Sequence, residues 1–457
     1  MKVPANMKFS RRKLIISAGA AATAALLPKR SWSDVAGANE KVNVAWCGVG
    51  NRGPRIIENF EKADIANFVA FCDVDPENKN INATKEKFPK AKIFQDWRKM
   101  LDDMDKDIDA VVVLVPDHSH FPITMAAMAA GKHVYTEKPS ARTFQEIELL
   151  MAAAERHGVV TQMGNQGHSG GNYFQFKALK EAGVMNSVTH VDAYMNKWRR
   201  WHPWGDLQAM PTGETAHASL DWDLWHSATP LHGFSKKFHP GNWRGWHQHG
   251  TGCFGDWGAH ILDTIHRFLE LGLPEKIKAT KRVLPNDLIF PLASTINFQF
   301  PQRDGMPAMD IDWYDGAENL PPLPDDFAGR TLDPKSPGKF IFAGENVFQG
   351  GSHGATLQEL NEDRAKALAA SGDFEKFGEN SDHYKNFLLA CRGDEETRSP
   401  FSVSGPLSQV LALGCMAQRL GGELEFDRET KQITNNETAN ALLADTPRKG
   451  WEQYYSL

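Results

Sequence analysis

Cysteine is scarce in this 457-residue chain, and neither sign of charge dominates it. The five cysteines are scattered and form no C-x-x-C pair, so the sequence predicts neither a disulfide framework nor a zinc site made of cysteine. A net charge of -6 is small for this length and gives no reason to expect a nucleic-acid partner. The sequence also has no internal repeat, coiled-coil pattern or low-complexity tract, which argues against a repeat or fibrous architecture.

The remaining composition is that of a soluble globular protein, with 41% hydrophobic and 24% charged residues. The chain is too long for one ordinary compact core, so we expect two domains.

The first residues have the pattern of an export signal. Arg11 and Arg12 directly precede an apolar run in "SRRKLIISAGAAATAALLP", and Ala36 and Ala38 supply small residues before a cleavage point. The apolar run is too short to span a membrane as an anchor. We therefore predict a twin-arginine signal over residues 1–38 and a periplasmic mature chain without stable membrane insertion. A chance Arg-Arg pair before a membrane anchor is the alternative.

Apolar strands alternate with helices in residues 39–163. Runs at 42–50, 67–75, 108–116, 132–139 and 159–164 read as strands, and 51–60, 94–103, 121–131 and 143–158 read as helices. Strands that are apolar on both faces predict a parallel sheet covered on both sides. We expect a doubly wound Rossmann domain here, so the fold class is α/β.

Residues 164–457 have a different texture and predict an α+β domain. Runs at 276–283, 295–300, 308–316 and 338–350 read as strands of an open, mostly antiparallel sheet, and 381–393 and 406–422 as helices. Residues 319–338 are a proline-rich surface excursion. An insert over about 190–260 is unusually rich in tryptophan and histidine. Its poor periodicity predicts irregular backbone.

The segment "GVGNRG" supplies Gly48, Gly50 and Gly53, with Asn51 and Arg52 between them. It follows the first strand and opens a helix. There the first glycine permits a tight turn, the second lets backbone approach a pyrophosphate, and the third lets the helix pack closely. Asp73 ends the second strand, where a carboxylate accepts hydrogen bonds from ribose hydroxyls and repels a 2'-phosphate. We predict NAD as the cofactor; a glycine turn that binds no nucleotide is the alternative.

Two further segments end strands at the edge where open α/β sheets bind ligands. They are "VPDHSHFP", with Pro116 and His120, and "TEKPS", with Glu137 and Lys138. Both are predicted to contribute to the cofactor site, with the Lys138 ammonium toward the nicotinamide end. A solvated loop lysine is the ordinary alternative.

Together with Asp73 and "GDWGAHILD" at 255–263, these motifs resemble the glucose–fructose oxidoreductase / inositol dehydrogenase (Gfo/Idh/MocA) family. The resemblance covers nearly the whole mature chain and is closest to the long, exported bacterial members. It implies that His260 is the general base, that Lys138 hydrogen-bonds the reacting oxygen, and that Asp256 orients the ring or binds a hydroxyl. The alternative makes Asp256 a helix-start residue favoured by the dipole and His260 a core histidine.

The tryptophan-rich insert offers flat apolar faces and polar groups that suit a sugar ring. The predicted substrate-binding residues are Asn165, Trp198, Arg199, His202, Trp243, Arg244 and Asp256. The alternative is a satellite aromatic core beneath long loops. A metal site from His247, His249 and His260 lacks a matching carboxylate pattern, and we predict no metal.

The resemblance implies a small-molecule carbohydrate or glycoside substrate and an NAD-dependent oxidation of a secondary hydroxyl. Free NAD is scarce in the predicted compartment, which favours bound cofactor that is regenerated at each turnover. A glycoside hydrolase working by transient oxidation and elimination is the alternative, although the branch that does this best departs from "TEKP" at the lysine. A carbohydrate-binding protein without turnover is a third reading. We also expect a homo-oligomer, a dimer or tetramer, through an exposed sheet face.

Overall fold

The computed structural model describes residues 41–456 except 196, 199, 334–335 and 373–380. The expected signal at 1–38 lies outside the described residues, and so does Arg199. Within the described ranges, no helix is both long and apolar enough to cross a membrane.

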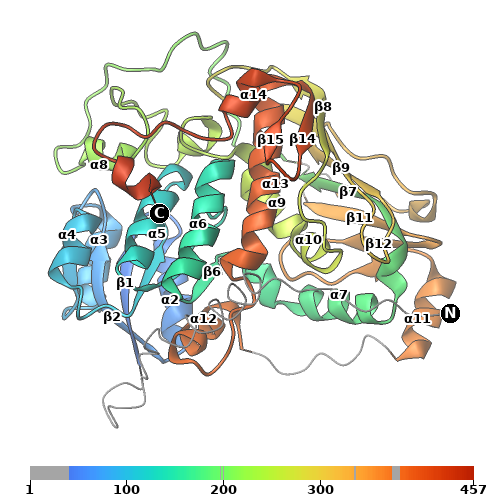
Figure 1. Cartoon of the computed structure of the whole chain (residues 1–457), viewed down its shortest axis with the longest axis horizontal. Coiled ribbons are helices and arrows are strands. Elements are labelled where there is room, and N and C mark those ends of the chain that lie inside the picture. Colours follow the sequence, from blue (N-terminus) through green and yellow to red (C-terminus); the bar gives the residue numbers. More distant parts are fainter. Residues whose placement is uncertain (1–40, 196, 199, 334–335, 373–380, 457) are drawn as a thin grey trace, which may run out of the picture. The chain divides into compact units, whose positions relative to one another are not determined.

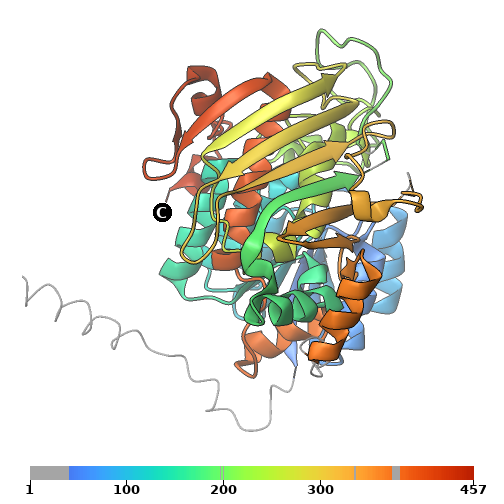
Figure 2. The ribbon, with the colours of Figure 1, turned by 90° about the vertical axis from the view of Figure 1, so that its right-hand side faces the viewer.

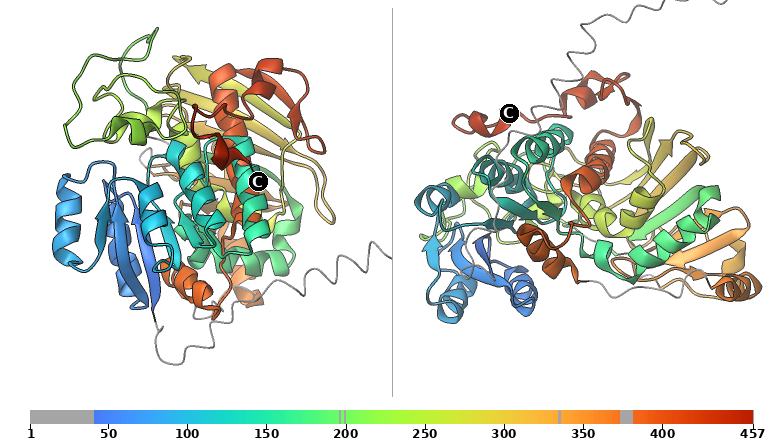
Figure 3. Two further views of the ribbon diagram at one scale, coloured as in Figure 1. Left: turned by 60° about the vertical axis from the view of Figure 1, so that its left-hand side comes forward. Right: turned by 60° about the horizontal axis from the view of Figure 1, so that its bottom comes forward.

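The N-terminal sheet is parallel and has six strands (Figures 1 and 3). Its spatial order is β3-β2-β1-β4-β5-β6, the arrangement of a doubly wound dinucleotide-binding fold. The strands are β1 (Val42–Cys47), β2 (Ala66–Cys72), β3 (Lys92–Phe94), β4 (Ala110–Val113), β5 (His133–Thr136) and β6 (Thr161–Met163). The prediction of a parallel sheet is confirmed, with β3 as a sixth strand that the sequence did not predict.

Helices cover both faces of this sheet, because successive side chains of each strand point to opposite sides. Ala45 and Cys47 of β1 pack with α4 (Trp97–Asp103), α5 (Asp117–Ala129) and α6 (Phe144–His157). Val44 and Trp46 of β1 pack with α2 (Gly53–Lys62) and with Ile81 of α3 (Lys79–Lys87). Two separate hydrophobic cores therefore enclose the sheet.

Local sequence sets the ends of α6. Thr143 accepts a hydrogen bond from the N–H of Glu146, whose carboxylate accepts from the Thr143 N–H. Gly158 ends the helix in the left-handed region at φ 61°. This capping box and glycine stop satisfy backbone groups that a helix end would otherwise leave unpaired. The helix predicted at 143–158 is confirmed.

The C-terminal sheet has nine strands in the order β13-β12-β11-β7-β10-β9-β8-β14-β15. All neighbouring pairs are antiparallel except β7 and β10, so the expectation of a mostly antiparallel sheet is confirmed. Its strands are β7 (Val188–Met195), β8 (Lys276–Val283), β9 (Ala293–Phe300), β10 (Met309–Asp315), β11 (Gly338–Ala343), β12 (Asn346–Gly350), β13 (Gln358–Glu359), β14 (Gly422–Asp427) and β15 (Gln432–Ile433). Figure 2 shows one broad face of this sheet largely without helical cover.

The long helix α13 (Phe401–Leu420) contacts α6 on one side and β8 and β9 on the other (Figure 1). Its Leu411 and Leu413 belong to the largest core, together with Phe254 and Phe298. The remaining helices are α7 (Gly171–Glu181), α8 (Trp222–His226), α9 (Gly252–Ile261), α10 (Asp263–Phe268), α11 (Glu362–Ser371), α12 (His383–Arg392) and α14 (Glu437–Ala441).

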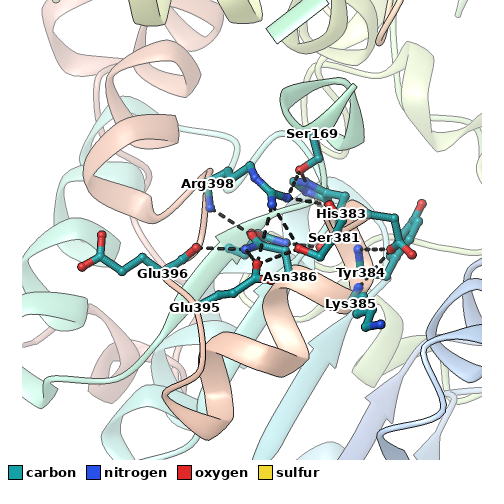
Figure 4. A network of polar contacts seen from close by, with 11 residues as sticks. Ser169, Ser381, His383, Tyr384, Lys385, Asn386, Glu395, Glu396 and Arg398 are labelled. Atoms are coloured by element: carbon teal, nitrogen blue, oxygen red, sulfur yellow. Dashed lines mark hydrogen bonds and ion pairs between the residues drawn. The ribbon is translucent and has the colours of Figure 1, made fainter. Parts of the chain in front are cut away.

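The helix α12 returns to the N-terminal sheet late in the chain. Its Tyr384 and Phe387 pack against Phe60 and Tyr135. A polar network holds its ends (Figure 4): Arg398 donates to the Ser381 carbonyl at 2.8 Å, and Asn386 donates to the Glu395 carboxylate at 2.7 Å. Residues far apart in sequence thus complete one face of the first sheet.

Candidate active site

The carboxyl ends of the parallel strands open into a cavity of about 690 Å³, a size suited to a small-molecule ligand. The insert lies across this edge of the sheet (Figure 1) and contributes Arg200, Trp225, Trp243 and Arg244 to the lining. The predicted cofactor residues that line the cavity are Gly48, Gly50, Asn51, Arg52, Asp73, Pro116, His120, Glu137 and Lys138. The cavity therefore joins the predicted nucleotide turn to the predicted catalytic residues Lys138 and Asp256.

The three glycines of the turn have different environments. Gly48 has a φ of +89°, and a Cβ there would lie 2.2 Å from the Leu114 carbonyl oxygen, so no other residue fits without a shift of backbone. At Gly50 a Cβ would meet no atom within 4 Å, which leaves backbone open to a ligand. At Gly53 the nearest atom would be 3.5 Å away, an ordinary contact, so close helix packing does not require glycine there.

Asp73 lies at the end of β2 beside this turn. Its Oδ2 accepts from the Val49 N–H at 3.0 Å, and its Oδ1 accepts from the Asp75 N–H at 3.0 Å. Burial raises the pKa of Asp73, and these two N–H groups oppose that rise. Each carboxylate oxygen retains a lone pair, which could accept a hydrogen bond from a ribose hydroxyl.

The loop of Glu137 and Lys138 is held from behind by His120. The His120 ring nitrogens lie 2.7 Å from the Pro139 carbonyl and 2.9 Å from the Val115 carbonyl. Glu137 is buried, forms a 4.0 Å ion pair with Arg52, and has no hydrogen-bond partner for its Oε1 among the described residues. Glu137 lines the cavity, and a buried carboxylate oxygen without a partner suits a ligand that donates a hydrogen bond.

Lys138 and Asp256 form an ion pair in the cavity wall. The Lys138 ammonium donates to the Asp256 carboxylate and also to its main-chain carbonyl, the latter at 2.7 Å. Arg200 binds the other carboxylate oxygen through Nε at 2.8 Å and Nη2 at 2.6 Å. Burial would raise the pKa of Asp256, but the charges of Lys138, Arg200 and Arg244 hold it well below its ordinary value. Asp256 is therefore a fixed anion between cations.

His260 lies one turn beyond Asp256 on α9 but does not itself line the cavity. Its ring stacks on His353 with centroids 3.9 Å apart, and its Nδ1 is buried without a hydrogen-bond partner among the described residues. Burial, followed by the charge of Lys138 and then His353, lowers the pKa of His260 well below its ordinary value. The ring is neutral at neutral pH, and the same lowered pKa makes it a weaker base than an exposed histidine.

The predicted substrate residues divide between two environments. Trp243 and Arg244 line the cavity, and the Arg244 guanidinium lies 4.2 Å from the Trp243 ring centroid. Trp198 is 55% exposed and does not line the cavity. His202 stacks on Trp204 with centroids 4.1 Å apart.

Asn165 is also away from the cavity. Its amide donates to the buried Asp263 carboxylate at 2.9 Å and accepts from Ser399 at 2.7 Å. These bonds already use its polar atoms, which gives Asn165 a structural environment.

Sequence reasoning did not identify Arg200, the residue that clamps Asp256. It chose the neighbouring Arg199, and nothing in the "RR" pair distinguishes the two. Trp225 and His239 also line the cavity without having been predicted. The only sequence signal for these two residues was the high tryptophan and histidine content of the insert.

The N-terminal region of the chain is similar in sequence to known oxidoreductases. Residues 42–165 match the family model described as "Oxidoreductase family, NAD-binding Rossmann fold" (GFO_IDH_MocA). The chain is 27% identical over 196 residues to scyllo-inositol 2-dehydrogenase (NADP(+)) of Bacillus subtilis, an alignment covering 43% of each protein. It is 31% identical over 180 residues to Glycosyl hydrolase family 109 protein 1 of Bacteroides fragilis, covering 35% of this chain and 38% of the relative. The alignments thus span less than half of these relatives.

A solved structure extends the likeness across the fold. The WlbA dehydrogenase of Chromobacterium violaceum, in complex with NADH and UDP-GlcNAcA, superposes with a TM-score of 0.58 at 18% identity. The match covers 85% of this chain and 97% of that one. At this identity the likeness concerns the fold.

Proposed function

Because this chain belongs to the Gfo/Idh/MocA family of oxidoreductases, we propose that it is an exported NAD-dependent enzyme that oxidises a secondary hydroxyl group of a sugar, polyol or glycoside. One observation carries the proposal. The Lys138–Asp256 ion pair and the open backbone at Gly50 line the same cavity. A hydroxyl-activating cation and a nucleotide turn are thus within one ligand-sized space.

The residues at the nucleotide end fit a dinucleotide. Gly50 leaves room for a pyrophosphate beside the N-terminus of α2, where the helix dipole favours negative charge. Asp73 supports NAD over NADP, since its anionic carboxylate would repel a 2'-phosphate. Bound NAD would supply the hydride acceptor for the oxidation.

Lys138 is the residue proposed to act on the substrate oxygen. An ammonium held as part of an ion pair stays charged and donates hydrogen bonds, which stabilises negative charge developing on an alkoxide. Asp256 and Arg200 fix its position, because the carboxylate is bound from both sides. Preorganised groups of this kind avoid a reorganisation cost during reaction.

His260 is the proposed proton acceptor for the hydroxyl proton. Its lowered pKa keeps the ring neutral, and the ring is buried away from bulk solvent. A protonated imidazole beside Lys138 would be unfavourable, so the proton would have to leave quickly. This feature suits a cycle in which a later reduction returns the proton to a carbonyl oxygen.

We place the enzyme in the periplasm, on the strength of the Arg11–Arg12 signal pattern. Twin-arginine export carries folded proteins and therefore suits an enzyme that takes up NAD before export. Retained cofactor, re-reduced or re-oxidised within each turnover, would make the reaction independent of free NAD outside the inner membrane.

The proposal is tested with Lys138→Ala and His260→Ala. We expect each substitution to lower turnover by at least 100-fold, the scale of a lost acid–base or oxyanion contact, while NAD still binds. Turnover on a panel of free sugars and polyols is followed by the near-ultraviolet absorbance of bound NADH. Near-native rates in both variants would refute the mechanism.

A redox-cycling glycoside hydrolase is the second candidate, favoured by the similarity to a glycosyl hydrolase family 109 protein. Aryl glycosides distinguish it from the first, since aglycone release without added NAD indicates the cycle. Accumulation of NADH with a free sugar indicates the dehydrogenase. Neither signal, with carbohydrate binding retained, would indicate a binding protein without turnover.

We also propose that the enzyme is a dimer or tetramer formed through the open face of the nine-stranded sheet (Figure 2). A broad sheet face without helical cover presents a surface that a second copy could bury. Light scattering coupled to gel filtration would measure the mass, and a monomer at micromolar concentration would contradict this proposal.

A further inference from the structure

Three histidines of the insert converge outside the cavity wall. His226 ends α8, His232 lies six residues later, and His249 precedes α9. Their nitrogen ligand atoms all lie within 4.8 Å of one another. The ring centroids are 4.3 Å apart for His226 and His232, 5.3 Å for His226 and His249, and 5.2 Å for His232 and His249.

Hydrogen bonds indicate where two of these rings carry their protons. His232 Nδ1 lies 2.9 Å from the Gly233 carbonyl, so it must donate, and its Nε2 bears a lone pair. The Thr229 hydroxyl donates to the His226 carbonyl at 2.7 Å and lies 3.5 Å from His226 Nδ1. If Nδ1 donates to that hydroxyl, the lone pair of His226 lies on Nε2 as well.

The Nε2 lone pairs of His226 and His232 have only one hydrogen-bond donor between them among the described residues, the ring of His249. His232 Nε2 lies 2.9 Å from His249 Nε2, so His249 could donate its single proton to that one ring. His226 Nε2 then has no donor, and it has no hydrogen-bond partner among the described residues. His226 is 0% exposed, so water does not replace the missing partner from bulk solvent. A buried acceptor without a donor costs free energy unless a cation satisfies it.

Aromatic side chains surround the three rings. Trp222, Trp225 and Phe238 pack around them, and no carboxylate belongs to the cluster. Neutral imidazoles are the form that binds metal ions.

We propose that His226, His232 and His249 bind a divalent transition-metal ion, with Zn²⁺ as the ion that best suits three imidazoles. Zinc–nitrogen bonds of about 2.0–2.1 Å in a tetrahedral arrangement separate the ligand nitrogens by roughly 3.3 Å. The 2.9 Å separation of two of the nitrogens and the 4.8 Å limit for all three bracket this value. The Gly233 carbonyl supplies the outer hydrogen bond that commonly orients a zinc-bound histidine.

The site is separate from the catalytic cavity but adjoins it. None of the three histidines lines the cavity, whereas Leu224 and Trp225 on the same helix do. His249 comes from the segment directly before α9, which carries Asp256 and His260. A metal ion here would bind α8 to the start of α9 and fix two parts of the cavity wall against each other.

The first test measures metal binding without any substrate. Purified full-length mature protein is stripped with a chelator, incubated with Zn²⁺, gel-filtered, and analysed for zinc by mass spectrometry. We expect about one zinc per chain, and at least a tenfold weaker affinity in both His226→Gln and His249→Gln. His217→Gln is the matched control, because His217 is an exposed histidine of the same insert, and it should bind as the wild type does.

A second measurement on the wild type covers the case in which a variant does not fold. Co²⁺ replaces Zn²⁺, and a visible absorption spectrum reports a low-symmetry site with nitrogen ligands. Added Zn²⁺ should abolish that spectrum and should raise the melting temperature of the stripped protein. Absence of both effects in the wild type overturns the proposal. So does equal zinc retention in folded His226→Gln and His249→Gln, which would indicate an adventitious ion only.

Discussion

Alanine at each glycine of the nucleotide turn separates cofactor binding from folding. Gly50→Ala places a methyl group where no protein atom lies within 4 Å. The folded protein should therefore keep its stability to within about 0.5 kcal/mol, or gain slightly from a stiffer unfolded chain. The same methyl group enters the space proposed for the pyrophosphate. We expect NAD affinity to fall at least tenfold, about 1.4 kcal/mol.

Gly48→Ala and Gly53→Ala are the comparison variants for stability and for NAD affinity. At Gly48 a methyl group would lie 2.2 Å from a backbone oxygen with φ at +89°. Backbone strain of about 1–3 kcal/mol and overpacking of about 1–3 kcal/mol together predict a loss of roughly 2–6 kcal/mol in unfolding free energy. At Gly53 the nearest contact is an ordinary 3.5 Å, so stability and affinity should both stay near wild type.

Urea denaturation of the stripped protein measures the unfolding free energy, and calorimetric titration measures NAD affinity. The decisive result is the contrast between Gly50→Ala and Gly53→Ala. Wild-type NAD affinity in a folded Gly50→Ala protein would refute the assignment of this turn to the pyrophosphate. Equal loss of affinity in both variants would show that the effect is on the helix and not on the open backbone.

Three further predictions concern Arg200, Asp73 and two buried histidines. Arg200→Ala removes two hydrogen bonds to the Asp256 carboxylate. Steady-state kinetics should show kcat lowered about tenfold, with NAD affinity unchanged. A lowered NAD affinity would contradict a role confined to the ion pair. Asp73→Ser removes the charge proposed to repel a 2'-phosphate. The ratio of NADP affinity to NAD affinity should therefore rise at least tenfold in a fluorescence titration. An unchanged ratio would show that other residues discriminate between NAD and NADP. Burial lowers the pKa of His118 to about 4 and that of His383 to about 3. Below about pH 6.5 the unfolded chain therefore binds protons that the folded chain does not, and each ring should cost about 2.5 kcal/mol of stability by roughly pH 4.5. Urea denaturation at about pH 6.5 and at about pH 4.5 measures this loss of unfolding free energy. The loss should be smaller in His118→Gln and His383→Gln than in the wild type.

Much of the fold follows from local pattern. The first sheet was predictable because strands such as β4 are apolar on both faces, and α6 carries its own capping box and glycine stop. The edge strand β3 has only three residues and is partly exposed, so it gives no apolar run. The helix α3 buries only Ile81 and Thr84, which leaves too little periodicity to recognise. In β7, "VTHVDAYM" interrupts alternation with His190 and Asp192.

The nucleotide end of the site was predictable because motif and strand end coincide there. Lys138 and Asp73 were identified because a strand directly precedes each one. Arg200 depends on backbone direction, since its own φ of +63° turns the chain, and adjacent arginines look alike in sequence. His226 and His232 were overlooked because their partner, His249, is distant in sequence and no spacing pattern connects them.

The late return of α12 to the first sheet has a consequence for protein engineering. The matched family region ends at residue 165, yet Phe387 and Leu388 cover part of the core beside Trp46, and Trp451 packs with Trp97 on the opposite face. A fragment cut at that boundary would expose both patches to water and would tend to aggregate. Chimaeras between relatives should therefore exchange α12 and the carboxyl-terminal tail along with the nucleotide-binding half.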